Sequence, residues 1–185
     1  MACRNCNGYM PDFSFETFDQ SGPVTNAPWE EYETFVRHVV IEEGVLSVGD
    51  FAFTKFALES ISLPEGLVYI GTQAFAHFWG DSIDLPSTLT GFGDYAFASS
   101  VNITEVEIPK AMTDFNYSAF AGCRQLSAYK VERGNPVYTA GNGSLYEADG
   151  TVLVRVPDNT QEYTVASGVE KIAPHAFEET AVEQV

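Results

Sequence analysis

Three carboxylates have the spacing that comes nearest to a chemical site in this sequence. Asp84, Glu105 and Glu107 flank the first apolar residue of two consecutive, similar segments, and Ser62 and Lys130 hold equivalent positions in the segments on either side. Neighbouring strands lie about 4.8 Å apart, so Asp84 and Glu107 are expected side by side. We predict a ligand-binding concave face formed by these five residues.

Three interpretations of the carboxylates remain open. Like charges on adjacent strands repel each other, so a cation bound by Asp84, Glu105 and Glu107, or a basic partner, would relieve the repulsion. Two carboxylates about 5 Å apart also match a retaining glycosidase, but a flat face has no deep pocket that excludes water. A solvated polar face is the simplest interpretation, because repeat proteins carry polar outer residues for solubility.

No other constellation predicts catalysis, a cofactor or a dedicated metal site. The motifs G-x-S-x-G, H-E-x-x-H, G-x-G-x-x-G and the P-loop do not occur. Cys3 and Cys6 form a C-x-x-C without the second pair that a zinc site needs. Cys123 takes a small core position and is predicted to be buried. We therefore predict that the protein is not an enzyme.

The carboxylates belong to a repeat that determines the fold. Similar segments begin at Val39, Ile61, Ile83, Val106 and Tyr163. Each segment ends with an Ala-Phe pair, whose phenylalanines are Phe53, Phe75, Phe97, Phe120 and Phe177. A period of 22 to 23 residues is typical of a solenoid, in which each unit buries its apolar face only by stacking on its neighbours.

One coil can be interpreted residue by residue in the copy that begins at Ile61. Its first residues alternate apolar and polar, which predicts a short strand. Pro64 lacks an N–H and ends the ladder, and Gly71 marks a corner. Ala74 and Phe75 are expected in a short helical turn, with the ring filling the interior.

The two ends of the array differ from its middle. Residues 1–37 are predicted to form an N-terminal cap, and residues 38–185 the solenoid. In the cap, an apolar series is expected to cover the first coil: Trp29, Tyr32, Phe35 and Val36. At the other end, Val182 and Val185 hold core positions of a coil that is not completed, so the array is predicted to stop mid-repeat. We expect either further repeats in a longer protein or association through this edge.

A variant coil with a hairpin insert is predicted at 129–162. The dipeptides Asn142-Gly143 and Asp149-Gly150 are strong hairpin turns. They predict three short antiparallel strands, at about 137–140, 144–147 and 152–156.

The charge of the chain limits its partners. With 9 basic and 26 acidic residues the formal charge is −17, which argues against nucleic acid and anionic membranes and favours basic partners. No apolar run approaches the roughly 18 residues of a membrane span, and the start of the chain has no signal-peptide pattern. Aromatic residues near the Ala-Phe pairs could add a recognition strip: Phe51, Trp79, Tyr95 and Tyr117.

The pattern V/I-x-I/L-P-x-G-V/L-x-x-I-G-x-x-A-F resembles the BspA-like leucine-rich repeat of bacterial surface proteins, and the segment CNGYMPDF…APWEEYETF resembles the entry to such arrays. The resemblance implies a leucine-rich-repeat-type right-handed solenoid of about five to six coils, mostly β with short helical turns. It also implies a cell-surface or secreted binding module that engages a protein partner, such as a host or neighbouring-cell surface, in adhesion. The alternatives are a structural spacer of a larger surface protein and, remotely, a carbohydrate-active enzyme.

Overall fold

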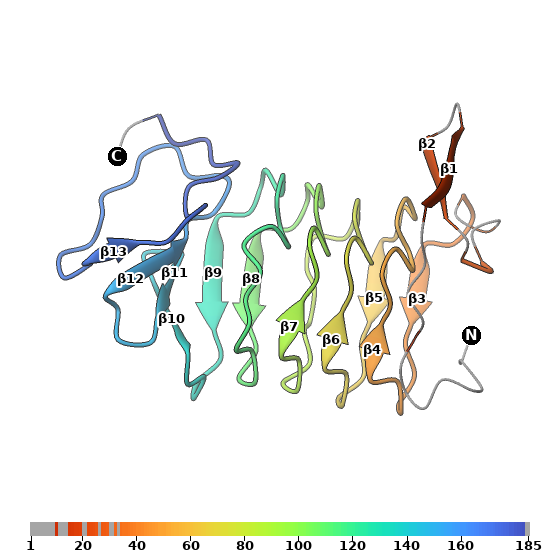
Figure 1. The fold of residues 1–185 in the computed structure, drawn as a ribbon, viewed down its shortest axis with the longest axis horizontal. Helices are drawn as coiled ribbons and strands as arrows, with labels where there is room; N and C mark the ends of the chain where they lie inside the picture. Colours follow the sequence, from red (N-terminus) through yellow and green to blue (C-terminus); the bar gives the residue numbers. More distant parts are fainter. Residues whose placement is uncertain are drawn as a thin grey trace.

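The fold is a β-solenoid, seen here in a computed structural model that describes Met10 and residues 15–19, 22–25, 27–29, 32 and 34–183 (Figure 1). These residues form short strands and turns and contain no α-helix. They accordingly include no helix with the length and hydrophobicity that a membrane-spanning segment requires. The predicted mostly β solenoid is confirmed.

Two rows of parallel strands run along the solenoid. In the first row β3 (His38–Val40) pairs with β5 (Ser60–Ser62), and β8 (Glu105–Ile108) pairs with β9 (Ala128–Val131). In the second row β4 (Ser47–Val48), β6 (Tyr69–Ile70) and β7 (Gly91–Phe92) pair in that order. The register sets Val39 beside Ile61 and Val106 beside Tyr129, as the repeat predicts. The stretch 82–84, between the two pairs of the first row, is not a strand.

The third side of each coil is built from turns, where short helical turns were predicted. Bonds from an N–H to the carbonyl three residues earlier close these turns, as in Ala74 to Gly71 (3.3 Å) and Phe78 to Phe75 (3.2 Å). Other N–H groups bond the next coil, as in Phe75 to Ala96 (2.9 Å). The backbone therefore alternates between bonds within its own coil and bonds between coils, which a helix could not do.

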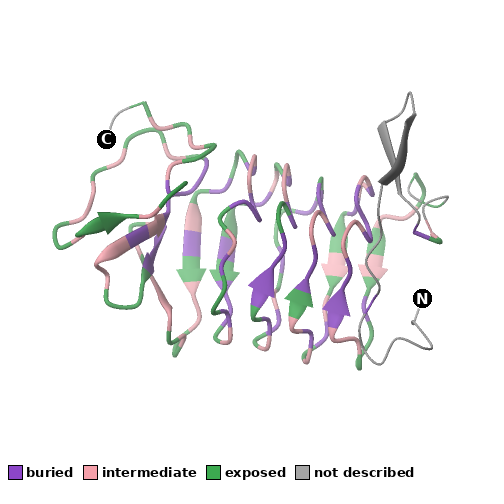
Figure 2. Cartoon of the chain, viewed as in Figure 1, coloured by how far each residue is buried: buried purple, intermediate pink, exposed green. Residues whose placement is uncertain are grey.

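The phenylalanines of the Ala-Phe pairs form one column through the core. Phe53, Phe75, Phe97 and Phe120 stack with successive centroid distances of 5.4, 5.5 and 5.3 Å. Trp29 extends the column at the N-terminal end, 5.5 Å from the Phe53 ring. Figure 2 shows buried residues throughout the middle coils and few in the last one.

Most turns contain left-handed residues that are not glycine. They lie two positions before and two after the phenylalanine, for example Gln73 (φ 50°) and His77 (φ 66°) around Phe75. The same position after Phe120 holds Gly122 (φ 75°). These residues let the chain switch between the two kinds of backbone bond, at a conformational cost of about 1–2 kcal/mol each.

We expect His77 to tolerate glycine better than valine. His77 is exposed, so His77→Gly removes strain but no core packing, whereas His77→Val places a β-branched residue at positive φ and should lower the free energy of unfolding by about 1–2 kcal/mol. Urea unfolding measures both variants. At Ser62, exposed in the extended strand β5, the order should reverse, with valine tolerated better than glycine. If glycine and valine ranked in the same order of stability at both sites, the role given to the left-handed turns would be wrong.

The corner glycines are needed for close approach of neighbouring coils. A Cβ on Gly71 would lie 2.5 Å from the Asp50 carboxylate, and one on Gly93 would lie 2.3 Å from the Thr72 nitrogen. Both distances are too short for any Cβ atom. The glycines recur at these corners because neighbouring coils pack too closely there for a side chain.

The variant coil carries the predicted hairpins. β10 (Tyr138–Gly141), β11 (Ser144–Glu147) and β12 (Val152–Arg155) pair antiparallel in sequence order. β12 then pairs parallel with β13 (Lys171–Ile172). The strand expected at 163–165 does not form. Instead, the Tyr163 hydroxyl lies 2.7 Å from that of Tyr146, in a second small core that also contacts Val182.

Some of the described cap residues pack on the first coil, and others are exposed. β1 (Phe15–Asp19) and β2 (Gly22–Thr25) form an antiparallel hairpin. Trp29 and Val36 pack on the core as predicted. Tyr32 is 45% exposed but lines a cavity over the first coil with Phe53. Phe35 is 81% exposed, so the prediction that it covers the coil is wrong. Cys3, Cys6 and Val185 lie outside the described residues.

Candidate binding surfaces

The outward residues of the first strand row form columns within each of its two strand pairs. His38 and Val40 are register partners of Ser60 and Ser62. Glu107 is the partner of Lys130. Lys130 also forms an exposed ion pair with Glu105, and this hydrogen bond raises the pKa of Lys130. One of the three predicted carboxylates therefore has a basic partner within the chain.

A hollow of about 340 Å³ brings Asp84 and Glu107 together with two carboxylates that the sequence analysis did not single out, Glu65 and Glu132. Ser87 holds Glu65 through its backbone N–H (3.2 Å) and its hydroxyl (2.9 Å). The Lys110 N–H donates to Glu132 at 2.8 Å. Asp84 and Glu107 accept no hydrogen bond from the described part of the chain, so their oxygens are available to a partner.

The hollow continues along the row into a second hollow, and Glu65 lines both. Glu65 also lines a neighbouring hollow with Ser62, Glu42 and Glu43. We call the surface formed by Glu42, Glu43, Glu65, Asp84, Glu107 and Glu132 the acidic groove. Glu43 and Glu65 lie four residues after the first apolar residue of their copies. This shared repeat position is the signal that could have found them.

The carboxylates do not assemble into a metal centre. Among the residues that the structure describes, no three His, Cys, Asp or Glu side chains are grouped so that they could hold a metal ion. The cation patch expected at Asp84, Glu105 and Glu107 therefore does not form such a group.

Three of the aromatic candidates are exposed, and the thiol candidate is buried. Trp79, Tyr95 and Tyr117 are exposed. Tyr117 also stacks on the ring of His175 at 4.1 Å, so the last coil uses part of its surface. Cys123 is buried, and burial raises the pKa of its thiol to about 12. The thiol is therefore a core group, as predicted.

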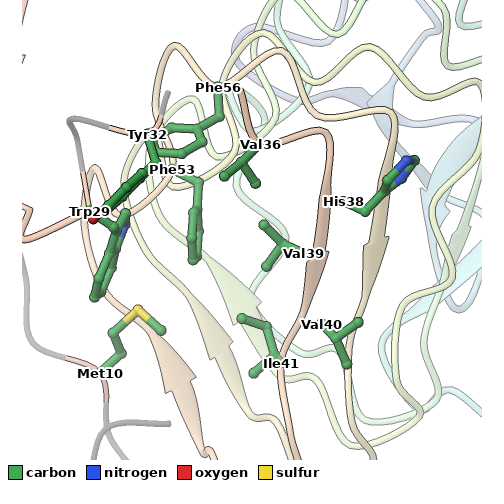
Figure 3. Close-up of a pocket in the computed structure, with 10 residues that line it drawn as sticks. All are labelled: Met10, Trp29, Tyr32, Val36, His38, Val39, Val40, Ile41, Phe53 and Phe56. Carbon is green, nitrogen blue, oxygen red and sulfur yellow. The ribbon is translucent and has the colours of Figure 1, made fainter. Parts of the chain in front are cut away.

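A second, apolar cavity of about 250 Å³ lies at the N-terminal end of the solenoid (Figure 3). Val39 and Ile41 of the first coil point into it, toward Phe53 and Trp29. His38 and Val40 lie on the other side of the same strand. The apolar periodicity of the sequence gave no sign of this cavity, because part of its lining comes from residues outside the repeat, such as Met10 and Trp29.

A buried ion pair joins the variant coil to the last coil. Arg155 and Asp158 are paired at 2.7 Å, and each side chain is 1% exposed. Arg155 also donates to the carbonyls of His175 (2.9 Å) and Glu178 (2.5 Å). Burial raises the pKa of Asp158 to about 6, although the charge of Arg155 opposes the increase.

Comparison with known proteins agrees with this architecture. The BspA type leucine rich repeat region matches residues 32–147 in six copies. No curated protein gives a significant sequence match.

Solved structures show the same fold. A leucine-rich repeat protein from Eubacterium ventriosum is 21% identical (TM-score 0.73), with 96% of this chain and 55% of that chain covered. The pneumococcal vaccine antigen PcpA is 19% identical (TM-score 0.63; 87% and 45% covered). A leucine-rich repeat protein from Bacteroides ovatus is 21% identical (TM-score 0.53; 96% and 50% covered). The chain thus spans about half the length of these proteins.

Proposed function

Because the chain belongs to the BspA-type leucine-rich repeat family, we propose that it is a non-enzymatic binding module of a bacterial cell-surface or secreted protein. Its partner is a protein with a basic surface, which the module engages in adhesion through the acidic groove. The observation that carries the proposal is the groove itself, where the carboxylates of Glu65, Asp84, Glu107 and Glu132 line one hollow.

The charge of the whole molecule supports a basic partner. A net charge of −17 attracts basic proteins over long range and raises their association rate. The open, solvated groove suits a protein surface better than a small substrate, because small-molecule sites are enclosed and mostly apolar. The hydrogen bonds of Glu65 and Glu132 support the same use, since they hold two carboxylates in place before binding.

Neutralising the groove should weaken partner binding selectively. Binders are selected from a peptide display library on the wild-type protein, and their affinity is measured by biolayer interferometry. The variant Glu65→Gln/Asp84→Asn/Glu107→Gln should bind them about tenfold or more weakly, since each close charge pair contributes roughly 1 kcal/mol or more. The matched variant Glu162→Gln/Glu170→Gln/Glu183→Gln removes the same charge from exposed sites of the last coil. It should retain binding.

An equal loss in both variants would mean that only net charge matters and would contradict a specific site. A failure to select any binder would favour the structural spacer.

A further inference from the structure

The first coil offers one strand edge that the described residues leave open. Among them, β3 pairs only with β5. Arg37 accepts a bond from the Ser60 N–H (3.2 Å) and the Ile41 N–H donates to Ser62 (2.9 Å), so these alternate residues face β5. In a strand, backbone groups of successive residues point to opposite edges. The N–H and C=O groups of His38 and Val40 therefore point away from the solenoid.

The other two sides of the first coil are occupied. The Met10 N–H donates to the Ser47 carbonyl in β4 at 3.2 Å. Trp29 stacks on Phe53 and donates from Nε1 to the Ala52 carbonyl at 2.6 Å. The cap therefore supplies a strand-like contact to one row and an aromatic ring to the phenylalanine column. The row that begins with β3 has no equivalent neighbour among the described residues.

The apolar cavity lies beside this open edge. Its wall includes Val36, Val39, Ile41 and Phe56 (Figure 3). In the middle coils, the inward residues of the first row, such as Ile83 and Val106, are buried in the core. The cavity of about 250 Å³ is thus the place where a preceding strand would put its inward residue.

We propose that β3 is a docking edge for an extended segment of a partner protein, which pairs with the backbone of His38 and Val40 and places an aliphatic side chain in the cavity. Strand addition of this kind obtains affinity from main-chain hydrogen bonds and specificity from a pocket for alternate side chains. It also gives the exposed edge a partner, since open edges are templates for pairing.

The acidic residues next to β3 indicate the charge at one end of the partner segment. Glu42 and Glu43 are exposed directly after β3 and continue into the acidic groove. The segment therefore carries Lys or Arg at the end that reaches these residues. Only this flank rests on the proposed function of the groove; the pairing with β3 stands on the backbone and the cavity.

The test uses a labelled synthetic peptide in which Ile alternates with Thr, followed by two Lys, and measures fluorescence anisotropy. Wild-type protein should bind it, and hydrogen exchange at the Val40 amide should slow. A peptide with N-methyl groups on alternate residues should bind about tenfold or more weakly, because it lacks the main-chain donors. This control leaves the protein unchanged.

Two protein variants locate the site. Val40→Pro removes an N–H that faces the open edge and leaves the donors to β5 in place, as proline allows at edges. It should weaken peptide binding about tenfold, whereas Val40→Thr should not. Val36→Trp should weaken binding by filling the cavity. Circular dichroism and the melting temperature check that each variant is folded.

The outcomes separate this inference from the groove. If Val40→Pro and the N-methylated peptide bind as well as their controls, the docking edge is wrong even when the groove variant loses its selected binders. If peptide binding needs Val40 while the groove variant keeps those binders, the edge stands and the groove fails. The wild-type protein could instead self-associate and fail to bind the peptide. If Val40→Pro abolished that self-association, a second copy would occupy the edge and the proposal would be overturned.

Discussion

Replacing Phe97 by alanine should lower the free energy of unfolding by about 3–5 kcal/mol. Phe97 is fully buried in the middle of the phenylalanine column, 5.5 Å from the ring of Phe75 and 5.3 Å from that of Phe120. The ring of Phe92 also lies beside it at nearly a right angle, with the two centroids 6.1 Å apart. The substitution therefore leaves a cavity that opens two interfaces between coils at once. The coils above and below cannot move together to close it, because backbone hydrogen bonds fix their spacing.

Asp94→Ala is the control for this prediction. Asp94 is exposed in the same coil, and its side chain accepts one bond, from Asn116 at 2.7 Å. It should lower the free energy of unfolding by less than about 1 kcal/mol. Urea denaturation measures both variants. Equal shifts of the midpoint would show that the assignment of inward and outward positions is wrong.

Removing the buried Arg155 should have an effect of similar size, about 3–5 kcal/mol for Arg155→Met at pH 7. The substitution leaves the Asp158 carboxylate buried without its counter-charge, and it takes the donor from the carbonyls of His175 and Glu178. The last coil should therefore detach before the rest of the solenoid unfolds. Urea unfolding measures the loss, and hydrogen exchange shows where it is located.

Adding Asp158→Asn to Arg155→Met shows how much of the loss comes from the unpaired charge and how much from lost packing. Arg155→Met/Asp158→Asn leaves no buried charge and should recover more than half of the loss. Losses that simply add would contradict the explanation by an unpaired charge.

The loss in Arg155→Met should also become smaller on acidification. The pKa of Asp158 is raised by burial from 3.8 to about 6. Removing Arg155 takes away the charge that lowers this pKa, so the pKa of Asp158 rises further in Arg155→Met. Lowering the pH from 7 to 5 then favours the folded state of the variant more than that of the wild type, because the folded carboxyl binds a proton more readily than the unfolded one. A loss that is unchanged at pH 5 would mean that Asp158 does not titrate in this range.

The sequence predicts the repeat well because its signal recurs in every coil. The spacing of Ile61 from Val39 fixed the register of β3 and β5, and the spacing of Phe75 from Phe97 fixed the stacked column. Each such assignment depends on residues of adjacent coils only. The turns Asn142-Gly143 and Asp149-Gly150 predicted the hairpins for a similar reason, since hairpin turns are local.

Features that depend on contacts outside the repeat were missed. Arg155 and Asp158 are three residues apart, but the sequence does not show that the pair is buried, because the carbonyls that also bind Arg155 come from the turn at 175–178. Phe35 was expected to cover the first coil from its helical spacing with Trp29 and Tyr32, but it is exposed and no α-helix forms there among the described residues. The acidic groove combines carboxylates from three different repeat positions, so no single column reveals it.

The bonds between coils also determine how the solenoid would respond to force. Each interface consists of a stacked ring and a few backbone bonds at one-coil spacing, so a pull along the long axis loads the interfaces in series and the weakest yields first. That interface is expected in the last coil, which lies beyond the phenylalanine column and buries few residues. In the regular array, each detached coil would release 22 residues, or roughly 75 Å of extended chain. Such a protein would lengthen in discrete steps and dissipate load while the remaining coils stay folded.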